Sequence, residues 1–171
     1  MLPTFPFQTL FVFLLISSLV VGISPSLAQE EKSSLECDGL FKGGKKPTVE
    51  QLEQIFQEHT KWIESEEKEG TRAKLCGANL TKAHLSMAHL TKADLTKANL
   101  TKAYLIKADL TKANLSKAEL RGANLSKANL AGATLTNVKN LIQSQLNQAC
   151  VDEDTTLPEG LTRPAPCAEE E

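Results

Sequence analysis

The sequence predicts an all-β solenoid made of stacked square coils, and three observations lead to this fold class. Thirteen consecutive pentapeptides, from Ala73 to Asn137, carry Ala at the first position and Leu at the third. On a helix, a step of five residues turns by roughly 140°, so the leucines would lie on every side. On a flat strand, side chains alternate with period two, so successive leucines would point to opposite faces. If each pentapeptide instead forms one side of a square, every Ala and Leu points inward, and four pentapeptides complete a coil.

The repeats also carry a family resemblance. The run from Ala93 to Lys102, ADLTKANLTK, resembles the A-(D/N)-L-x-x signature of the pentapeptide-repeat proteins. The resemblance covers residues 73–137 and implies a right-handed quadrilateral β-helix, in which the Leu and Ala side chains stack in interior columns. These 65 residues provide about three coils, hence a stack of about 15 Å at the ~4.8 Å strand spacing. The best-known activity of the family uses long acidic coils that mimic DNA and protect a topoisomerase; this coil is short and basic, so the resemblance does not extend to that activity.

Residues 1–28 are predicted to be an export signal. The apolar run from Leu10 to Ile23 is shorter than the ~20 residues that cross a bilayer. Ser26-Leu27-Ala28 then supplies small residues at the cleavage positions, so we expect the mature chain to begin at Gln29, without a transmembrane segment, in the periplasm, a lumen or the extracellular space. No Lys or Arg precedes the apolar run, which leaves an uncleaved anchor as the alternative.

The four cysteines all follow this predicted signal. An even number of cysteines in an exported chain indicates disulfides. Their spacings match no paired-ligand zinc pattern, and free buried thiols are the main alternative. Of the possible pairings we favour Cys37 with Cys76 and Cys150 with Cys167, because each pair then lies at one end of the coil stack.

The segments on either side of the repeats are predicted to be caps. In residues 29–72, Thr48 and Gln51 read as the capping box of a helix. Apolar residues recur along that helix at helical spacing: Val49, Leu52, Ile55, Phe56, Trp62 and Ile63. We expect this face to cover the open first coil, with a partner-binding helix as the alternative. In residues 138–171, a short helix between Asn140 and Cys150, using Leu141, Ile142, Leu146 and Ala149, would form a second cap before an acidic tail.

Charge is strongly segregated along the chain. Residues 73–137 contain ten basic and three acidic residues, a net charge of +7, whereas residues 29–72 carry −4 and residues 138–171 carry −5. Eight of the basic residues occupy the fifth repeat position: Lys82, Lys92, Lys97, Lys102, Lys107, Lys112, Lys117 and Lys127. Stacking of the coils gives every side of the square one lysine pair. This even lattice favours a solvated, aggregation-resistant surface, with a site for an anionic polymer (glycan, lipid phosphate or nucleic acid) as the alternative.

The sequence favours a non-enzymatic protein. Interior positions hold Ala and Leu, which exclude a catalytic core. His89 should stack over Asp109 and His84 over Tyr104, but no nucleophile is arranged with them and a solenoid wall is convex, so we expect a surface ion pair between His89 and Asp109. We therefore expect no catalytic residue, metal site or cofactor. The leading hypothesis is an exported scaffold or interaction module that binds a protein partner.

Overall fold

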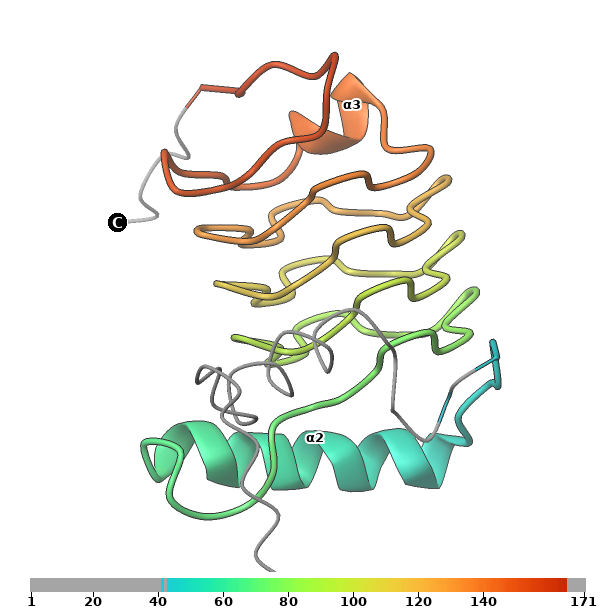
Figure 1. Cartoon of the computed structure of the whole chain (residues 1–171), viewed down its shortest axis with the longest axis vertical. Coiled ribbons are helices and arrows are strands. Elements are labelled where there is room, and N and C mark those ends of the chain that lie inside the picture. The colour runs from blue at the N-terminus through green and yellow to red at the C-terminus, as the bar shows by residue number, and fades with distance from the viewer. Residues whose placement is uncertain (1–40, 42, 166–171) are drawn as a thin grey trace, which may run out of the picture.

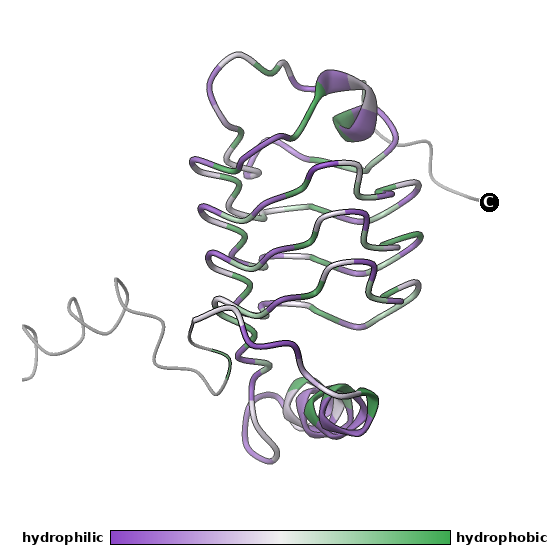
Figure 2. Cartoon of the chain, turned by 90° about the vertical axis from the view of Figure 1, so that its right-hand side faces the viewer, coloured by the Kyte–Doolittle hydropathy of each residue, from purple (hydrophilic) through white to green (hydrophobic). Residues whose placement is uncertain are grey.

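The computed structural model of the chain describes residue 41 and residues 43–165 (Figure 1). Two helices flank the repeats along the chain, α2 at Val49–Glu64 and α3 at Gln143–Leu146. Between them the backbone winds in stacked turns, with α2 lying across one end of the stack and α3 at the other (Figures 1 and 2). The chain between the helices therefore forms an elongated solenoid with one helix near each end.

Parallel bridges set the register of the coils. Within the repeats, each bridge joins the second residue of one pentapeptide to the second residue of the fourth pentapeptide after it, as in the series Lys74, Asp94, Asn114 and Thr134. A parallel bridge places two residues side by side on neighbouring strands. Four pentapeptides consequently complete one turn of the backbone, as predicted.

The interior consists of the first and third repeat positions. All thirteen central leucines are at most 1% exposed, and eleven of the thirteen alanines are buried with them. The two exceptions, Ala83 and Ala88, are only partly buried. The inward orientation predicted for the Ala and Leu columns is confirmed.

Most corners are built by hydrogen bonds that explain the rest of the motif. At the corner after Asp94, its carboxylate Oδ1 accepts the N–H of Thr96 at 3.0 Å, an arrangement that favours Asp or Asn at the second position. The N–H of Ala98 donates to the carbonyl of Leu95 at 3.0 Å. Lys97, the fifth residue, has φ 58° and donates its N–H to Ser116 of the next coil at 2.9 Å. The corner thus turns through a left-handed residue without leaving a backbone donor unsatisfied.

Helix α2 begins at the predicted capping box. Thr48 Oγ1 accepts the N–H of Gln51 at 3.2 Å, and the Gln51 side chain accepts the N–H of Thr48 at 2.9 Å. Three residues of the predicted apolar face, Leu52, Ile55 and Phe56, pack against the core cluster. The inclusion of Val49 in that face was wrong, since its side chain is 67% exposed. Val49 lies at the very start of the helix, beyond the residues that reach the coil.

The C-terminal segment covers its end of the solenoid mainly through side-chain hydrogen bonds. The predicted helix between 140 and 150 is shortened to α3, in which Leu146 is buried, whereas Ile142 lies just before the helix and is 56% exposed. The buried Gln145 donates from Nε2 to the carbonyls of Leu120 and Ala123 at 2.9 and 2.8 Å. The Thr155 hydroxyl similarly donates to the carbonyl of Leu130 at 2.9 Å. The carbonyl of Ala123 is one that a further coil would pair, whereas the carbonyls of Leu120 and Leu130 also accept the corner N–H groups of Ala123 and Ala133.

Cys76 and Cys150 are both disulfide-bonded. Their predicted partners, Cys37 and Cys167, lie outside the described residues, so the pairing stays a prediction. The predicted export signal, residues 1–28, also lies outside them. Within residues 41 and 43–165, none of the helices is long and apolar enough to cross a membrane.

Candidate interaction surface

The predicted lysine lattice occupies the corners of the coil. All eight lysines have a left-handed backbone, with φ between 56° and 61°. The fifth-position N–H of each lysine donates to a fourth-position carbonyl of the next coil or, for Lys127, to Gln148. Lysines one coil apart therefore stack, as Lys82 does with Lys102 and Lys107 with Lys127. Each corner column holds two lysines, so the structure spreads the charge around the solenoid and gathers it on no single wall.

Lys92 differs from the other lattice lysines because it contacts the end of α2. Its ammonium pairs with the Glu67 carboxylate and lies 5.9 Å from the centre of the Trp62 ring. Both members of the ion pair keep nearly half of their side-chain surface exposed, so this pair adds little stability by itself. The contact joins the segment after α2 to the first coil.

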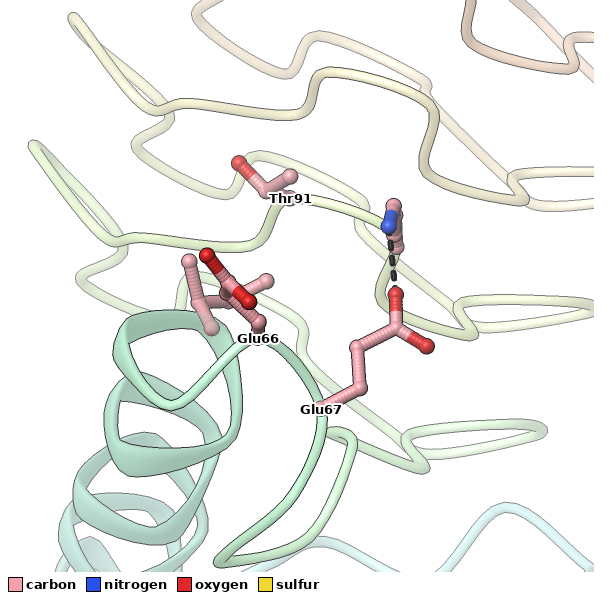
Figure 3. Close-up of a pocket in the computed structure, with 5 residues that line it drawn as sticks. Glu66, Glu67 and Thr91 are labelled. Carbon is pink, nitrogen blue, oxygen red and sulfur yellow. Dashed lines mark hydrogen bonds and ion pairs between the residues drawn. The ribbon is translucent and has the colours of Figure 1, made fainter.

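A pocket of about 290 Å³ opens beside this ion pair and is lined by Ile63, Glu66, Glu67, Thr91 and Lys92 (Figure 3). Its polar groups already have partners. The ion pair occupies Glu67 and Lys92, and the Thr91 hydroxyl donates to Asp109 Oδ2 at 2.8 Å. A nucleophile activated by a neighbouring base is therefore missing from this pocket. Across the described residues, no group of three or more His, Cys, Asp or Glu side chains could hold a metal ion.

The two predicted outward columns form, but only one has the expected chemistry. His84 stacks on Tyr104 with ring centres 4.9 Å apart and planes 10° apart. His89 bridges to Asp109 through the backbone, yet within residues 43–165 no ion pair joins their side chains. The expectation of a surface ion pair was wrong because Asp109 is engaged by threonines: Oδ1 accepts the N–H and hydroxyl of Thr111, and Oδ2 accepts the hydroxyl of Thr91. Burial by itself would raise the pKa of Asp109, but these hydrogen bonds together with His89 leave it below its usual value.

Sequence reasoning missed His59, which lies at the contact between α2 and the first coil. His59 is fully buried, its Nδ1 accepts the N–H of Ala73 at 3.1 Å, and its ring stacks on Trp62 with centres 5.6 Å apart. Its Nε2 is buried without a hydrogen-bond partner. The signal was present in the sequence, because His59 falls at helical spacing from Ile55 and Phe56.

The repeat region matches a known family. Residues 71–105 and 103–139 match the family model for pentapeptide repeats, with eight copies. Residues 71–139 are therefore pentapeptide repeats of this family. Such repeats imply a quadrilateral β-helix, and the four-cornered path described above agrees with it. No curated protein matches the chain.

Several solved pentapeptide-repeat structures are similar to this chain. Rfr23 from the cyanobacterium Cyanothece 51142 is 36% identical, with 48% of this chain and 58% of that chain covered and a TM-score of 0.36. A protein of the Arabidopsis thaliana thylakoid lumen is 26% identical, with 53% and 57% covered and a TM-score of 0.39. HetL from Nostoc sp. strain PCC 7120, involved in heterocyst differentiation regulation, is 27% identical, with 56% and 55% covered and a TM-score of 0.24. This chain thus spans little more than half the length of each.

Proposed function

We propose that this pentapeptide-repeat protein is a non-enzymatic scaffold or protein-interaction module. The observation that carries the proposal is the filling of the coil: the third position is always a buried Leu, and the first is an Ala that is buried or, at Ala83 and Ala88, partly buried. A solenoid filled in this way offers its outer walls, and the hydroxyl and ion-paired groups of the pocket beside α2 are already bonded. Binding through a wall is the activity that such an architecture supports.

The finer architecture belongs to the same proposal. We infer a right-handed β-helix of about three coils, closed by α2 at its N-terminal end and by residues 138–165 at its C-terminal end. The packing of Leu52, Ile55 and Phe56 on the core supports the first cap, and the hydrogen bonds of Gln145 and Thr155 support the second. Short repeat arrays depend on such caps, because an open end exposes apolar surface and backbone.

We further propose export through residues 1–28 and one disulfide at each end of the stack. The disulfide-bonded state of Cys76 and Cys150 supports an oxidising compartment. Mass spectrometry of protein recovered from that compartment should give Gln29 as the first residue, with digestion products that link Cys37 to Cys76 and Cys150 to Cys167. Each bridge should contribute about 3 to 4 kcal/mol, so that reduction lowers the melting temperature. Four free thiols in exported protein would contradict this part of the proposal.

A cross-linking pull-down from the native compartment tests the interaction module. A defined protein partner should be recovered at low and at moderately raised salt, since binding through a wall uses apolar contact besides charge. Recovery of no protein above the level seen with unfolded, reduced chain would overturn the proposal.

A second candidate function is binding of an anionic polymer through the lysine lattice. The net charge of +7 on residues 73–137 favours it. Binding of this kind releases counterions, so affinity for heparin should fall steeply and linearly on a logarithmic salt scale. Elution from immobilised heparin at the salt concentration of a neutral protein would exclude this candidate.

A further inference from the structure

One wall of the solenoid departs from the repeat pattern in two consecutive coils. It consists of the third repeat, residues 83–87, and the seventh repeat, residues 103–107, and is called here the aromatic wall. Where most repeats have Asn or Asp, Thr or Ser, and Lys, this wall carries His84, Met87, Tyr104 and Ile106. Met87 is 68% exposed and Tyr104 is 44% exposed. Single apolar side chains at a surface need no explanation, but a group gathered on adjacent coils favours an interaction site.

The backbone of the aromatic wall is open along its lower edge. Ala83 and Leu85 pair with the following coil, since the N–H of Tyr104 donates to the carbonyl of Ala83 at 2.9 Å and the N–H of Leu85 donates to the carbonyl of Tyr104 at 2.8 Å. The N–H and carbonyl of His84 point the other way, and neither forms a backbone hydrogen bond in the described part of the chain. On the preceding wall, by contrast, the N–H of Asn79 donates to the carbonyl of Lys45 at 2.9 Å. An exposed edge of this kind can pair with an added extended strand.

The core beneath the same edge is incompletely covered. Ala73 and Ala78, on the two walls before it, are buried, whereas Ala83 and Ala88 are partly exposed. The stack of His84 on Tyr104 likewise ends at the edge, with one face of the His84 ring free of a further ring among the described residues. A strand added below His84 would cover the two alanines and continue the stack at the spacing of neighbouring strands.

The charges around the aromatic wall determine which kind of strand fits. Lys82 and Lys102 occupy the corner before the wall, Lys107 occupies the corner after it, and no acidic residue belongs to either repeat. A second copy docked wall to wall would bring two sets of these lysines together, and such like-charge contact disfavours self-association. Carboxylates on the incoming strand would instead meet the ammonium of Lys82 beside the edge, with Lys102 and Lys107 one coil further from it.

We propose that the aromatic wall binds an extended acidic segment of a partner protein, which adds as a strand below His84 and places an apolar or aromatic side chain against Met87 and Ile106. The proposal rests on the proposed function as an interaction module and names the chemistry of the partner. Main-chain hydrogen bonds would supply affinity, while the apolar side chain and the flanking lysines would supply specificity.

The test uses a display library of random peptides panned on the oxidised full-length chain. Enriched peptides should combine an apolar or aromatic residue with Asp or Glu. A synthetic copy of the enriched sequence should bind the triple variant Met87→Lys, Tyr104→Asn, Ile106→Thr at least about tenfold more weakly. These substitutions are suited to the fold, because other repeats hold the same residues in the same backbone conformations. Methylation of the peptide's central amide nitrogen should weaken binding comparably, since it removes the donor to the His84 carbonyl.

A graft onto the opposite wall separates the edge from the side chains. Four substitutions made in the triple variant rebuild the same side chains on the opposite wall: Asp94→His, Lys97→Met, Asn114→Tyr and Ser116→Ile. On that wall the backbone edge is closed, because the N–H of residue 94 already donates to the carbonyl of Ala73 at 2.9 Å. Peptide binding should stay lost in this graft. Restored binding would overturn the role of the open edge.

Three other results would overturn the proposal: no enrichment, enrichment of basic peptides, or equal binding to the triple variant. A dimer in sedimentation that dissociates in the triple variant would show that the occupant is a second copy and would equally overturn it. A protein partner still recovered in the pull-down by the triple variant would leave the proposed function standing and place the contact on another surface.

Discussion

Acidification should weaken the attachment of α2 to the first coil through His59. The Nδ1 atom of this fully buried side chain accepts the N–H of Ala73, so it must carry no proton. In a protonated ring, the N–H at Nδ1 would face the N–H of Ala73, and two donors cannot form a hydrogen bond with each other. Burial lowers the pKa of His59; the carbonyl of Thr91 opposes this shift, and the positive charges of Arg72 and His89 add to it.

The sign and size of the effect follow from linkage between protonation and folding. An unfolded histidine titrates near pH 6.5, and the folded His59 titrates lower, so the unfolded state binds the proton first as the pH falls. The stability contributed by neutral His59 is therefore complete above about pH 6.5 and is lost as the pH falls toward the folded pKa, with a slope approaching about 1.4 kcal/mol per pH unit. From pH ~7.5 to pH ~5.5 the free energy of unfolding should fall by at most about 1.4 kcal/mol. The lowered pKa values of Asp109 and Asp152 act below about pH 4, outside this window.

Urea denaturation across this pH range measures the effect, with His59→Asn as the diagnostic variant. The Asn side-chain oxygen can accept the N–H of Ala73 but does not titrate, so the variant should lose most of the slope. A control substitution of the exposed His84 by Asn should leave it intact. A slope in His59→Asn equal to that of the parent chain would refute the assignment to His59.

Three further predictions address the coil. Leu105→Asp should prevent folding because it places a charge without a partner in a fully buried column. The outward substitution Lys112→Glu should change the unfolding free energy by less than about 0.5 kcal/mol. If circular dichroism and thermal melting fail to distinguish these two variants, the assigned register is contradicted. Asn99→Ala removes the oxygen that accepts a corner N–H at 3.0 Å and should cost about 1 kcal/mol in urea denaturation, so an unchanged midpoint would argue against the corner bond. Lys102→Gly relieves the strain of a left-handed lysine and should raise the free energy of unfolding by up to about 1 kcal/mol. Lys74→Gly, at a bridged position, should lower the free energy of unfolding. The opposite order of stabilities would be incompatible with the assigned backbone conformations.

The coil could be predicted from the sequence because its determinants are local and repeated. Ala and Leu at fixed spacing leave one geometry that buries them all, and the structure buries Leu105 and its counterparts accordingly. The capping box at Thr48 was predictable for the same reason, since both partners lie within one helical turn. The left-handed corners were not predicted, because eight of them hold Lys, a residue that does not indicate positive φ.

The ends of the solenoid were harder to predict because they depend on contacts between distant segments. His59 bonds to Ala73, and Gln145 bonds to carbonyls more than twenty residues away. Gln is usually exposed, so burial of Gln145 is not expected from local pattern, whereas helical spacing places His59 beside the apolar face but does not indicate its bond to Ala73. The expected ion pair of His89 with Asp109 failed similarly, since Thr91 on the neighbouring coil competes for the carboxylate.

In the lysine lattice, the positive charge of the corners is independent of the backbone hydrogen bonds that hold the coils together. A left-handed lysine costs roughly 1–2 kcal/mol relative to a conformation suited to it, so the corners would be easier to form with Gly, as at Gly122. Lysine therefore occupies these corners for a reason other than backbone geometry. Its N–H still joins the next coil, and that bond needs no particular side chain.

It follows that charge can be removed from the corners without weakening the fold. A chain with Gly in place of several exposed lattice lysines should be at least as stable as the parent while losing much of its positive charge. If the lattice binds an anionic polymer, this chain should lose heparin binding and keep its melting temperature. If the lattice serves solubility, the same chain should show unchanged ligand binding and a greater tendency to aggregate. The evenly distributed positive charge would then no longer repel other molecules from the exposed backbone edges. Binding loss that is accompanied by unfolding would contradict the separation of charge from fold at the corners.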